Sequence, residues 1–566
     1  MDKNPKKIVI IGGVACGMKT ASRLRRRDPD AEITVIEKGG YLSYGACGFP
    51  YYLSGMVKEH TGLLDTPIGV VRDEAFFKNV KGVTAHVHTE AIKIDPGQKT
   101  VEARSTDTGE RLILSYDKLV MATGAFPFVP PLEGKDLEGV FRLSSMEDAL
   151  AAKKFLSEKS VQKGVIVGGG LIGLEVAEAL SLQGISVTVV EKLEHIVPGL
   201  LDKEMALLLT RYLEQKGISI RTGISARKFA DNGSGMLKAV VTEDEEIPAE
   251  FALVSIGVRP NVSLAREAGI EIGGTGAIKV NEHQQTSDPD IYAGGDCAEN
   301  MHRLTGKAVY TPMGSTANKH GRVIADHIAG DDTAFPGVMG TGIFKVFDYS
   351  VGRTGLSERE AKEQGFDTVC ATVSGPDRPH FYEGAQPIII KLIAEKATGN
   401  ILGAQMLGLG DVAKRLDIVV SFLSFNGTVE RLAALDLAYA PPYSPAMDNI
   451  ITTANVLGNK LSGIALGCSP LEVKTKLDQG DDFVFLDVRS PGEYEEVRID
   501  HPAVRLLPLG RLRTEADSLP RDKEILISCK TSLRAYEAQL ILQARGFERV
   551  RFMDGGILAW PFAVEQ

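Results

Sequence analysis

The stretch "GVIVGGGLIGLEVAEALSLQGISVTVVEK", residues 164–192, decides the fold of this chain. Its pattern is that of a buried strand, a glycine turn, a helix and a second strand that closes at Glu191. Gly168, Gly170 and Gly173 complete a GxGxxG motif in the turn. Such a turn lets the backbone approach a pyrophosphate at a helix N-terminus, and the carboxylate after the second strand binds ribose hydroxyls. The stretch therefore predicts a βαβ unit that binds a dinucleotide.

A second unit with this layout lies near the start of the chain. "KKIVIIGGVACGMKTASRLRRR" (residues 6–27) is followed by the strand "EITVIEK", which closes with Glu37. Gly12 and Gly17 hold the outer glycine positions, and Val14 replaces the middle one. Two such units predict two bound dinucleotides.

Composition bounds the remaining possibilities. The 566 residues predict three or four domains, and a net charge of −10 offers no general attraction to nucleic acid or acidic membranes. Six scattered cysteines form neither a zinc motif nor a disulfide framework. The N-terminal sequence lacks the features of a signal peptide, and no apolar run is long enough to span a bilayer. We therefore expect a cytoplasmic protein with no metal site and with no nucleic-acid or membrane partner.

Three further turns follow apolar strands. They are "LVMATGAFP" (119–127), "LVSIGVRPN" (253–261) and "IYAGGDCAE" (291–299). Together with the two glycine turns, these motifs resemble the two-dinucleotide flavoprotein disulfide reductases over residues 6–455. The resemblance implies that the first unit binds FAD, that the second binds NAD(P)H, and that Asp296 holds the ribityl chain of the flavin. The cofactor-binding residues implied are Gly12, Gly17, Glu37, Thr123, Gly124, Asp296, Gly168, Gly170, Gly173, Glu191 and Gly257.

The charge of Glu191 bears on the choice of nicotinamide cofactor. A carboxylate repels a 2′-phosphate and therefore favours NADH over NADPH. Lys192 follows directly, so NADPH stays open.

The turn "SYGACGFPYYL" (residues 43–53) contains Cys47, which is the candidate redox thiol. Most reductases of the resembled family carry a CxxxxC pair, but positions 42 and 52 are Leu and Tyr here. A lone redox cysteine must pass through a mixed disulfide, a persulfide or a sulfenic acid. This limits the resemblance to NADH peroxidases, NADH oxidases and reductases of coenzyme A disulfide or persulfide. Ala15 stands where the peroxidases place a histidine, and "CGFPYY" is similar to the turn of the coenzyme A-disulfide reductases.

The same resemblance implies how a substrate is held. Arg23 and Arg26 match basic residues that meet the phosphates of coenzyme A, and their i, i+3 spacing puts them on one helix face. The alternative is a solvated basic run, because "RLRRR" contains further arginines. Ser43 matches a family serine before the cysteine, whereas Ala46 replaces the family's asparagine and removes one polar contact.

Two tyrosines complete the resembled site and would reach Cys47 from the partner subunit of a homodimer. "HFYEGAQPIIIKL" matches the first at Tyr382, and "LAYAPPYSPAMDNI" matches the second at Tyr439, with Tyr443 as the alternative. A phenol beside a thiolate can protonate a leaving sulfur. The alternative is that both are interface or core aromatics.

The last hundred residues contain motifs that differ from those of the preceding chain. "FVFLDVRSPGEYEE" (483–496), "CKTSLR" (529–534) and "VRFMDGGILAW" (550–560) resemble a rhodanese domain. A loop between a strand and a helix can aim backbone N–H groups at an anion above Cys529, and Lys530 and Arg534 add positive charge. Such surroundings suit a cysteine persulfide, although the same geometry holds phosphate in some phosphatases.

These motifs predict an α/β protein. It contains two Rossmann-like dinucleotide-binding domains, an α+β dimerisation domain and a C-terminal α/β rhodanese domain. The expected division is 1–118 and 255–334 for the FAD-binding domain, 119–254 for the NAD(P)H-binding domain, 335–455 for dimerisation, 456–469 for a linker and 470–566 for the rhodanese domain.

The resemblance implies a reductase that uses FAD and NAD(P)H to convert persulfides or polysulfides, such as coenzyme A persulfide, to thiol and sulfide through Cys47. Cys529 would carry sulfane sulfur. Three alternatives stay open. They are a coenzyme A-disulfide reductase, an NADH oxidase, and a tail that serves as a sulfur carrier or docking module for a partner protein.

Overall fold

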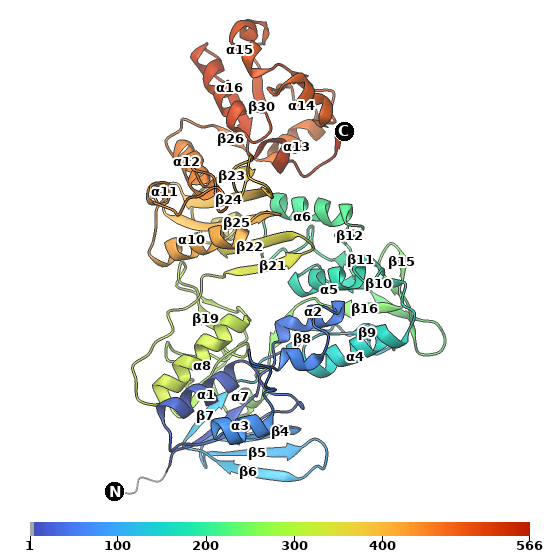
Figure 1. Cartoon of the computed structure of the whole chain (residues 1–566), viewed down its shortest axis with the longest axis vertical. Coiled ribbons are helices and arrows are strands. Elements are labelled where there is room, and N and C mark those ends of the chain that lie inside the picture. The colour runs from blue at the N-terminus through green and yellow to red at the C-terminus, as the bar shows by residue number, and fades with distance from the viewer. Residues whose placement is uncertain (1–4, 566) are drawn as a thin grey trace. The chain divides into compact units, whose positions relative to one another are not determined.

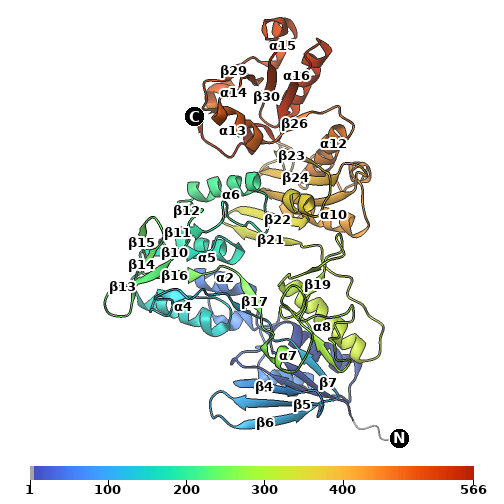
Figure 2. The same ribbon diagram turned by 180° about the vertical axis from the view of Figure 1, so that it is seen from behind.

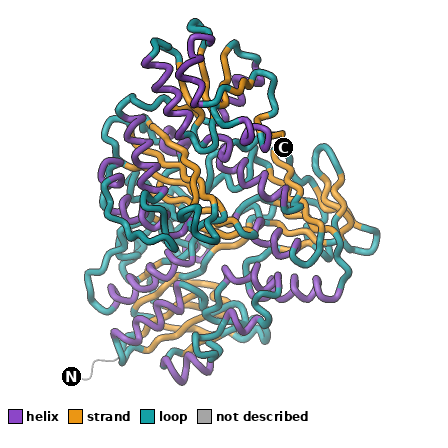
Figure 3. Tube along the Cα trace, turned by 45° about the horizontal axis from the view of Figure 1, so that its top comes forward, coloured by secondary structure: helices purple, strands orange, loops and turns teal. Residues whose placement is uncertain are grey.

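The computed structural model describes residues 5–565, which fall into two compact units (Figure 1). The first unit runs to residue 192 and resumes at 223–338, and the second contains residues 193–222 and the chain from 339 onward. Helices and strands are found throughout the chain (Figure 3). Within residues 5–565, no helix combines the length and the hydrophobicity needed to cross a membrane.

The first unit contains a parallel sheet built on the N-terminal glycine turn, with the strand order β18-β7-β1-β2-β3. Its strands are β1 (Lys7–Ile11), β2 (Glu32–Ile36), β3 (Thr84–His86), β7 (Lys118–Met121) and β18 (Ile291–Ala293). Helices α1 (Cys16–Arg27) and α8 (Gly314–Ile328) cover one face. A small antiparallel sheet covers the other (Figure 2), and the strands are apolar because both faces are covered. The strands of this small sheet are β4 (Thr89–Asp95), β5 (Thr100–Ser105) and β6 (Arg111–Ser115).

The second parallel sheet of this unit carries the GxGxxG turn. Its neighbouring strands β11-β10-β16-β9 are β11 (Ser186–Glu191), β10 (Lys163–Val167), β16 (Phe251–Val254) and β9 (Val140–Phe141). Helix α5 (Leu171–Ser181) follows the turn, and α2 (Phe49–Ser54) packs against both α5 and α4 (Met146–Glu158). The segment after Cys47 therefore lies against the second dinucleotide unit.

The second unit contains an antiparallel sheet with the strand order β21-β22-β25-β24-β23. The strands are β21 (Gly342–Val346), β22 (Tyr349–Gly355), β25 (Ile401–Gly408), β24 (Pro387–Glu395) and β23 (Thr368–Pro376). Helix α10 (Val412–Ser424) packs on β22 and β25, and α12 (Asn449–Leu461) packs on β23 and β24.

The C-terminal part of the second unit is a parallel sheet with helices around it. Its order β26-β31-β30-β27-β29 joins β26 (Gly467–Cys468), β31 (Val550–Met553), β30 (Glu524–Ser528), β27 (Phe483–Asp487) and β29 (Val504–Leu506). Its helices are α13 (Pro470–Gln479), α14 (Pro491–Glu496), α15 (Leu509–Glu515) and α16 (Leu533–Ala544). The predicted fold class, with two Rossmann-like sheets, one antiparallel domain and a C-terminal α/β domain, is confirmed.

Candidate functional site

The first glycine turn lies between β1 and α1 and fits a pyrophosphate. Gly12 has φ +109°, and a Cβ there would overlap the carbonyl oxygen of Ala122. A Cβ at Gly17 would overlap the carbonyl oxygen of Gly12. Only glycine fits at both positions, because any side chain there would prevent the backbone segments of the turn from approaching each other closely.

Glu37 closes this turn. Its Oε2 accepts the N–H of Gly13 at 2.6 Å, and its Oε1 accepts the N–H of Gly39 at 2.8 Å. Burial raises the pKa of Glu37. A cavity of about 560 Å³ lies beside the carboxylate and is lined in part by Gly12, Glu37 and Thr123. These features fit the ribose and adenine end of a dinucleotide.

The GxGxxG turn repeats this construction closely. Gly168 also has φ +109°, and its Cβ would overlap the carbonyl oxygen of Ser255, while a Cβ at Gly173 would overlap that of Gly168. The Oε2 of Glu191 accepts the N–H of Gly169 at 2.8 Å. No atom lies within 4 Å of where a Cβ of Gly170 would be, which leaves this side of the turn open to a ligand.

The remaining predicted cofactor residues lie at the carboxyl end of the first sheet or on the strands that leave it. Thr123 follows β7 and Asp296 follows the adjacent β18. Gly124 and Gly257 flank the paired strands β8 (Ala125–Pro127) and β17 (Val258–Pro260). Burial raises the pKa of Asp296. The buried His320 accepts the N–H of Gly295 at 3.2 Å and so supports the turn before this aspartate, a contact that the sequence did not indicate.

Cys47 lies in a single turn of 3₁₀-helix, Ala46–Gly48, and its side chain is exposed. The N–H of Gly45 donates to Leu63 at 2.9 Å, and the buried Phe49 anchors the start of α2. Among residues 5–565 all six cysteines are free thiols, so Cys47 has no disulfide partner.

Acidic and aromatic groups lie near the Cys47 turn. Burial raises the pKa of Tyr51, and the charges of Glu175 and Glu178 raise it further. A negative charge on Cys47 acts in the same direction, so Tyr51 lies within electrostatic reach of the thiol. Burial and the charge of Glu178 raise the pKa of Glu175 to about 7. Glu175 was not predicted as a site residue; it lies on α5, and its charge acts on Tyr51 of α2.

Ser43 connects the Cys47 turn to the first glycine turn. Its backbone N–H donates to the carbonyl of Gly13 at 2.8 Å, and its φ is +51°. Its hydroxyl accepts a hydrogen bond from Arg72 Nη1 at 3.2 Å. Arg72 was also missed, because a single arginine in a loop 29 residues away carries no recognisable pattern.

Arg23 and Arg26 both lie on α1, as their spacing predicts. The Nε of Arg23 donates to the buried Asp326 of α8 at 2.7 Å, whereas Arg26 is exposed. Arg23 is thus held in place by a carboxylate that the sequence did not connect with it.

The two tyrosines lie in the second unit. Tyr382 is in the loop between β23 and β24, and Tyr439 is in the segment before α12. Their side chains are 38% and 54% exposed, and Tyr443 is 69% exposed. All three are therefore open to a partner rather than packed in the core of their own domain.

Cys529 follows β30 and its side chain is only 1% exposed. Its carbonyl accepts the N–H of Ile557 at 2.8 Å, and the Ser532 hydroxyl donates to Met553 at 3.1 Å. Ser532 has φ +82°, a strained value for a residue with a side chain, directly before α16. Lys530 is exposed at the rim of this loop.

Arg534 does not stand free in this loop, because it is paired with Glu493 of α14. Both terminal nitrogens donate to the carboxylate at 2.7 Å, and this hydrogen bonding lowers the pKa of Glu493 to about 2. Below the loop, the buried Arg489 pairs with Asp487 at 2.7 Å. Asp487, Arg489 and Glu493 all lie within residues 483–496, but the sequence pattern indicates no role for them.

Comparison with protein families identifies the chain. The pyridine nucleotide-disulphide oxidoreductase model matches residues 6–312. The chain belongs to this family. In this oxidoreductase, the family's dimerisation domain matches residues 342–451 and a rhodanese-like domain matches 469–562. The resemblance predicted from the sequence is confirmed, including its rhodanese extension.

Individual relatives of this oxidoreductase carry related names. It is 37% identical over 452 residues to the NAD(P)H coenzyme A polysulfide/persulfide reductase of Pyrococcus horikoshii, covering 80% of this chain and 98% of that protein. It matches the structure of a NAD-dependent persulfide reductase from A. fulgidus with a TM-score of 0.93 and 44% identity, over 98% and 100% of the two chains. Reduced CoADR-RHD of Bacillus anthracis matches with a TM-score of 0.90 and 33% identity, over 99% and 98%.

Proposed function

We propose that this oxidoreductase uses NAD(P)H to reduce persulfides or polysulfides, such as coenzyme A persulfide, to thiol and sulfide. Cys47 is the redox thiol, and Cys529 carries sulfane sulfur to or from the substrate. The observation that carries the proposal is one exposed, unpaired cysteine whose turn is hydrogen-bonded through Ser43 to the first glycine turn. A redox thiol with no second cysteine must pass through a mixed disulfide, a persulfide or a sulfenic acid, and a persulfide substrate leads to the persulfide.

The first glycine turn and the residues beside it would hold FAD; these are Gly12, Gly17, Glu37 and Asp296. The second glycine turn would hold the nicotinamide nucleotide through Gly168, Gly170, Gly173 and Glu191. Thr123 and Gly124 would complete the first site and Gly257 the second. FAD, when bound, supplies the redox chemistry that links a two-electron hydride donor to a thiol. Glu191 favours NADH, because it would repel a 2′-phosphate.

The chain's own groups account for the sulfur chemistry. The Cys47 thiolate attacks the outer sulfur of RSSH, the S–S bond breaks, and the electron pair leaves with RS⁻. A phenol, Tyr382 or Tyr439 of a second copy, supplies the proton that makes RSH. Two electrons from NAD(P)H then cleave the Cys47 persulfide to thiolate and sulfide. The net reaction, RSSH + NADH + H⁺ → RSH + H₂S + NAD⁺, balances in atoms and charge.

Substrate selection would rest on groups around this turn. Arg26 is exposed on α1 and Arg23 is fixed beside it by Asp326, so both suit the phosphates of coenzyme A. Ser43 lies between Arg72 and the cysteine turn. Ala46 offers no polar side chain, so the contact that the asparagine of the resembled reductases makes would be missing here.

One anaerobic experiment separates the candidate functions. NADH consumption and sulfide release are measured with coenzyme A persulfide, coenzyme A disulfide, a polysulfide and, separately, oxygen. The proposal predicts the highest kcat/KM with the persulfide or polysulfide and one sulfide released per NADH consumed. Faster turnover of the coenzyme A disulfide, or of oxygen without sulfide, would contradict it in favour of the corresponding alternative.

The role of Cys529 is tested in the same assay. Cys529→Ser is expected to abolish sulfur transfer from a sulfane donor such as thiosulfate and to leave direct turnover of coenzyme A persulfide in place. If Cys529→Ser changes no reaction with any sulfur donor, the domain serves as a docking module instead.

A further inference from the structure

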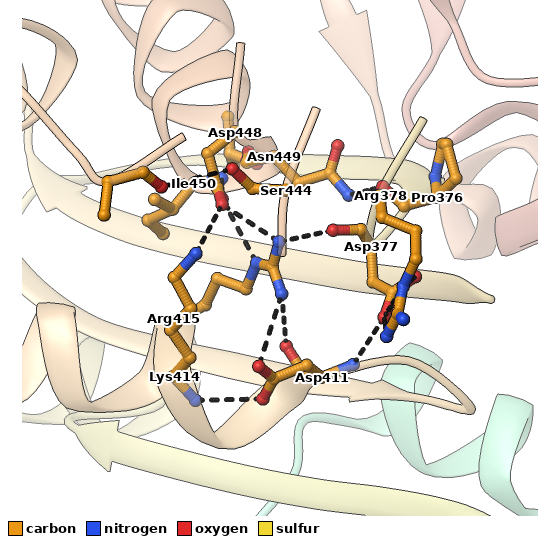
Figure 4. Close-up of polar contacts among 12 residues, drawn as sticks. Pro376, Asp377, Arg378, Asp411, Lys414, Arg415, Ser444, Asp448, Asn449 and Ile450 are labelled. Atoms are coloured by element: carbon orange, nitrogen blue, oxygen red, sulfur yellow. Dashed lines mark hydrogen bonds and ion pairs between the residues drawn. The ribbon is translucent and has the colours of Figure 1, made fainter. Parts of the chain in front are cut away.

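The two loops that carry the candidate tyrosines share one buried polar network. The first loop, residues 377–386, connects β23 and β24 and exposes Phe381 and Tyr382. The second precedes α12 and exposes Tyr439, Tyr443 and Met447. They lie more than 50 positions apart in sequence, yet the residues at their bases meet in Figure 4.

Asp377 closes the first loop. Its N–H donates to the carbonyl of Gln386 at 2.8 Å, and the N–H of Gln386 donates to its Oδ1 at 2.9 Å. Asp377 is only 1% exposed. Burial by itself raises the pKa of Asp377, but hydrogen bonds from Arg378 and from two backbone N–H groups bring that pKa below its ordinary value. The loop therefore closes on a carboxylate that stays ionised.

Asp448 ends the second loop. Its carboxylate caps α12 by accepting the N–H of Ile450 at 3.1 Å, and its side chain is buried. Within this loop, the buried Ser444 donates its backbone N–H to Ala440 at 3.2 Å. The segment with Tyr439 thus lies between an internal turn and a helix cap.

Arg415 of α10 joins the two loop bases. Its Nε and Nη2 bind the carboxylate of Asp448 at 3.1 and 2.9 Å, and its Nη2 also donates to the carbonyl of Asp377 at 2.7 Å (Figure 4). The side chain is fully buried. A second link runs beside it, because Asn449 Nδ2 donates to the carbonyl of Pro376 at 2.8 Å. Gly375 permits this contact, since a Cβ there would lie 2.7 Å from Asn449 Oδ1.

We infer that Arg415 is a positioning residue that fixes the loops of Tyr382 and Tyr439 as one rigid unit. A buried guanidinium that binds a carboxylate and a carbonyl at once tolerates only one arrangement of its partners. Moving the second loop would separate Arg415 from the Asp448 carboxylate and leave a buried charge unpaired, and moving the first would break the buried hydrogen bond to the Asp377 carbonyl. The occupant of this aromatic surface is a second copy of the chain, because the matched dimerisation domain contains both loops. The catalytic part of the inference rests on the function proposed above.

Hydrogen exchange on the flavin-loaded, full-length protein tests the positioning directly. Arg415→Lys keeps the charge and removes the planar fork. We expect amide exchange to become about tenfold faster or more in both 377–386 and 437–447, with little change in β22. The matched control is Ser421→Ala, which removes an exposed hydroxyl of the same helix that bonds the Asp417 carbonyl and should loosen neither loop. Faster exchange in only one loop, or in neither, would overturn the inference.

A milder variant covers the case in which Arg415→Lys does not fold. Asn449→Ala removes only the link to Pro376 and should loosen both loops by a smaller factor. If Asn449→Ala changes exchange in neither loop, the two loops are not held as a unit and the inference fails.

A double-mutant cycle tests the catalytic consequence. We expect Arg415→Lys to lower kcat for the persulfide about tenfold and to leave the KM for NADH unchanged. Its effect should not add to that of Tyr382→Phe combined with Tyr439→Phe, since all act through the same phenols. Fully additive losses would overturn the positioning role. If the loops loosen but the tyrosine variants retain full activity, the tyrosine step of the proposed function fails while the positioning of the loops stands.

Discussion

Cys47 and Cys529 each lie in a short loop before a helix, but their surroundings differ. Residues 43–54 around Cys47 contain no charged side chain, and the thiol is exposed. The loop at Cys529 carries Lys530, Arg534 follows it on α16, and the thiol is buried next to Ser528, the strand partner of Asp487. One cysteine lies in an apolar aromatic turn and the other in a charged, hydrogen-bonded cradle.

The difference indicates where each cysteine obtains its chemistry. The contacts of the Cys529 loop come from residues 487–558 of the C-terminal α/β domain, and the adjoining Asp554 and Gly555 also bind Lys460 and Ser374. The Cys47 turn would draw electrons from two nucleotide sites and protons from tyrosines on loops outside its own unit. We therefore expect changes near Cys529 to act locally and changes far from Cys47 to reach it.

Substitution of either cysteine should give the largest effect on activity. If the two cysteines acted as one site, both activities would be lost together and the comparison would fail. Cys47→Ser is expected to lower NADH-dependent persulfide reduction by at least about a thousandfold, because Cys47 is the thiol whose persulfide the electrons of NADH would cleave. It should leave sulfur transfer from thiosulfate within about twofold of wild type. Both activities are measured on the same flavin-loaded preparation, and a parallel loss of both would show that the sites depend on each other.

Arg489→Met should have the next largest effect, on stability. It leaves Asp487 buried without its partner, which costs about 3–5 kcal/mol of the free energy of unfolding of the C-terminal domain. Scanning calorimetry should detect this as a separate, earlier transition. The control is Arg498→Met, whose partner Glu565 is half exposed, and we expect a change below about 1 kcal/mol. Equal losses of stability in the two variants would contradict the conclusion that the buried Asp487–Arg489 pair stabilises the domain of Cys529.

Much of this comparison could be predicted from the sequence. Gly12, Gly17 and the GxGxxG motif indicate their turns because close backbone contacts admit only glycine. The tail was recognisable because its strands, its acidic segment and Cys529 follow one another in a fixed order. These features are local, and a local pattern survives in a linear sequence.

The supporting contacts could not be predicted, because they join distant positions. Arg23 meets Asp326 303 residues away, and Arg415 meets Asp448 33 residues away across two elements. No spacing rule connects such pairs. The exposure of Cys47 and the burial of Cys529 likewise depend on tertiary packing rather than on the residues adjacent to them in the sequence.

Substitution of Glu175, near the Cys47 turn, should have a smaller effect on stability that depends on pH. Its pKa is raised to about 7, so the folded protein favours the neutral acid. Stability is then retained at low pH and lost as the pH rises from about 4.5 through 7. We expect the free energy of unfolding of Glu175→Gln, relative to that of wild type, to rise by about 2 kcal/mol between pH 5 and pH 8, after allowance for partial exposure. Urea unfolding at the two pH values measures this difference.

A related variant checks the cause of that shift. Glu178→Gln removes the neighbouring negative charge and should recover part of the same loss, since this charge raises the pKa of Glu175. A stability difference for Glu175→Gln that does not change with pH would contradict the buried-acid explanation.

The most direct test follows one sulfur atom. Enzyme whose thiols are reduced, in the absence of NADH, is mixed anaerobically with coenzyme A persulfide whose outer sulfur is ³⁴S, quenched with an alkylating agent, and digested for mass spectrometry. We expect ³⁴S on the peptide that contains Cys47, in Cys529→Ser as well as in wild type, and its release as sulfide once one equivalent of NADH is added. Label that appears only on Cys529, or sulfide released by Cys47→Ser at the wild-type rate, would contradict it.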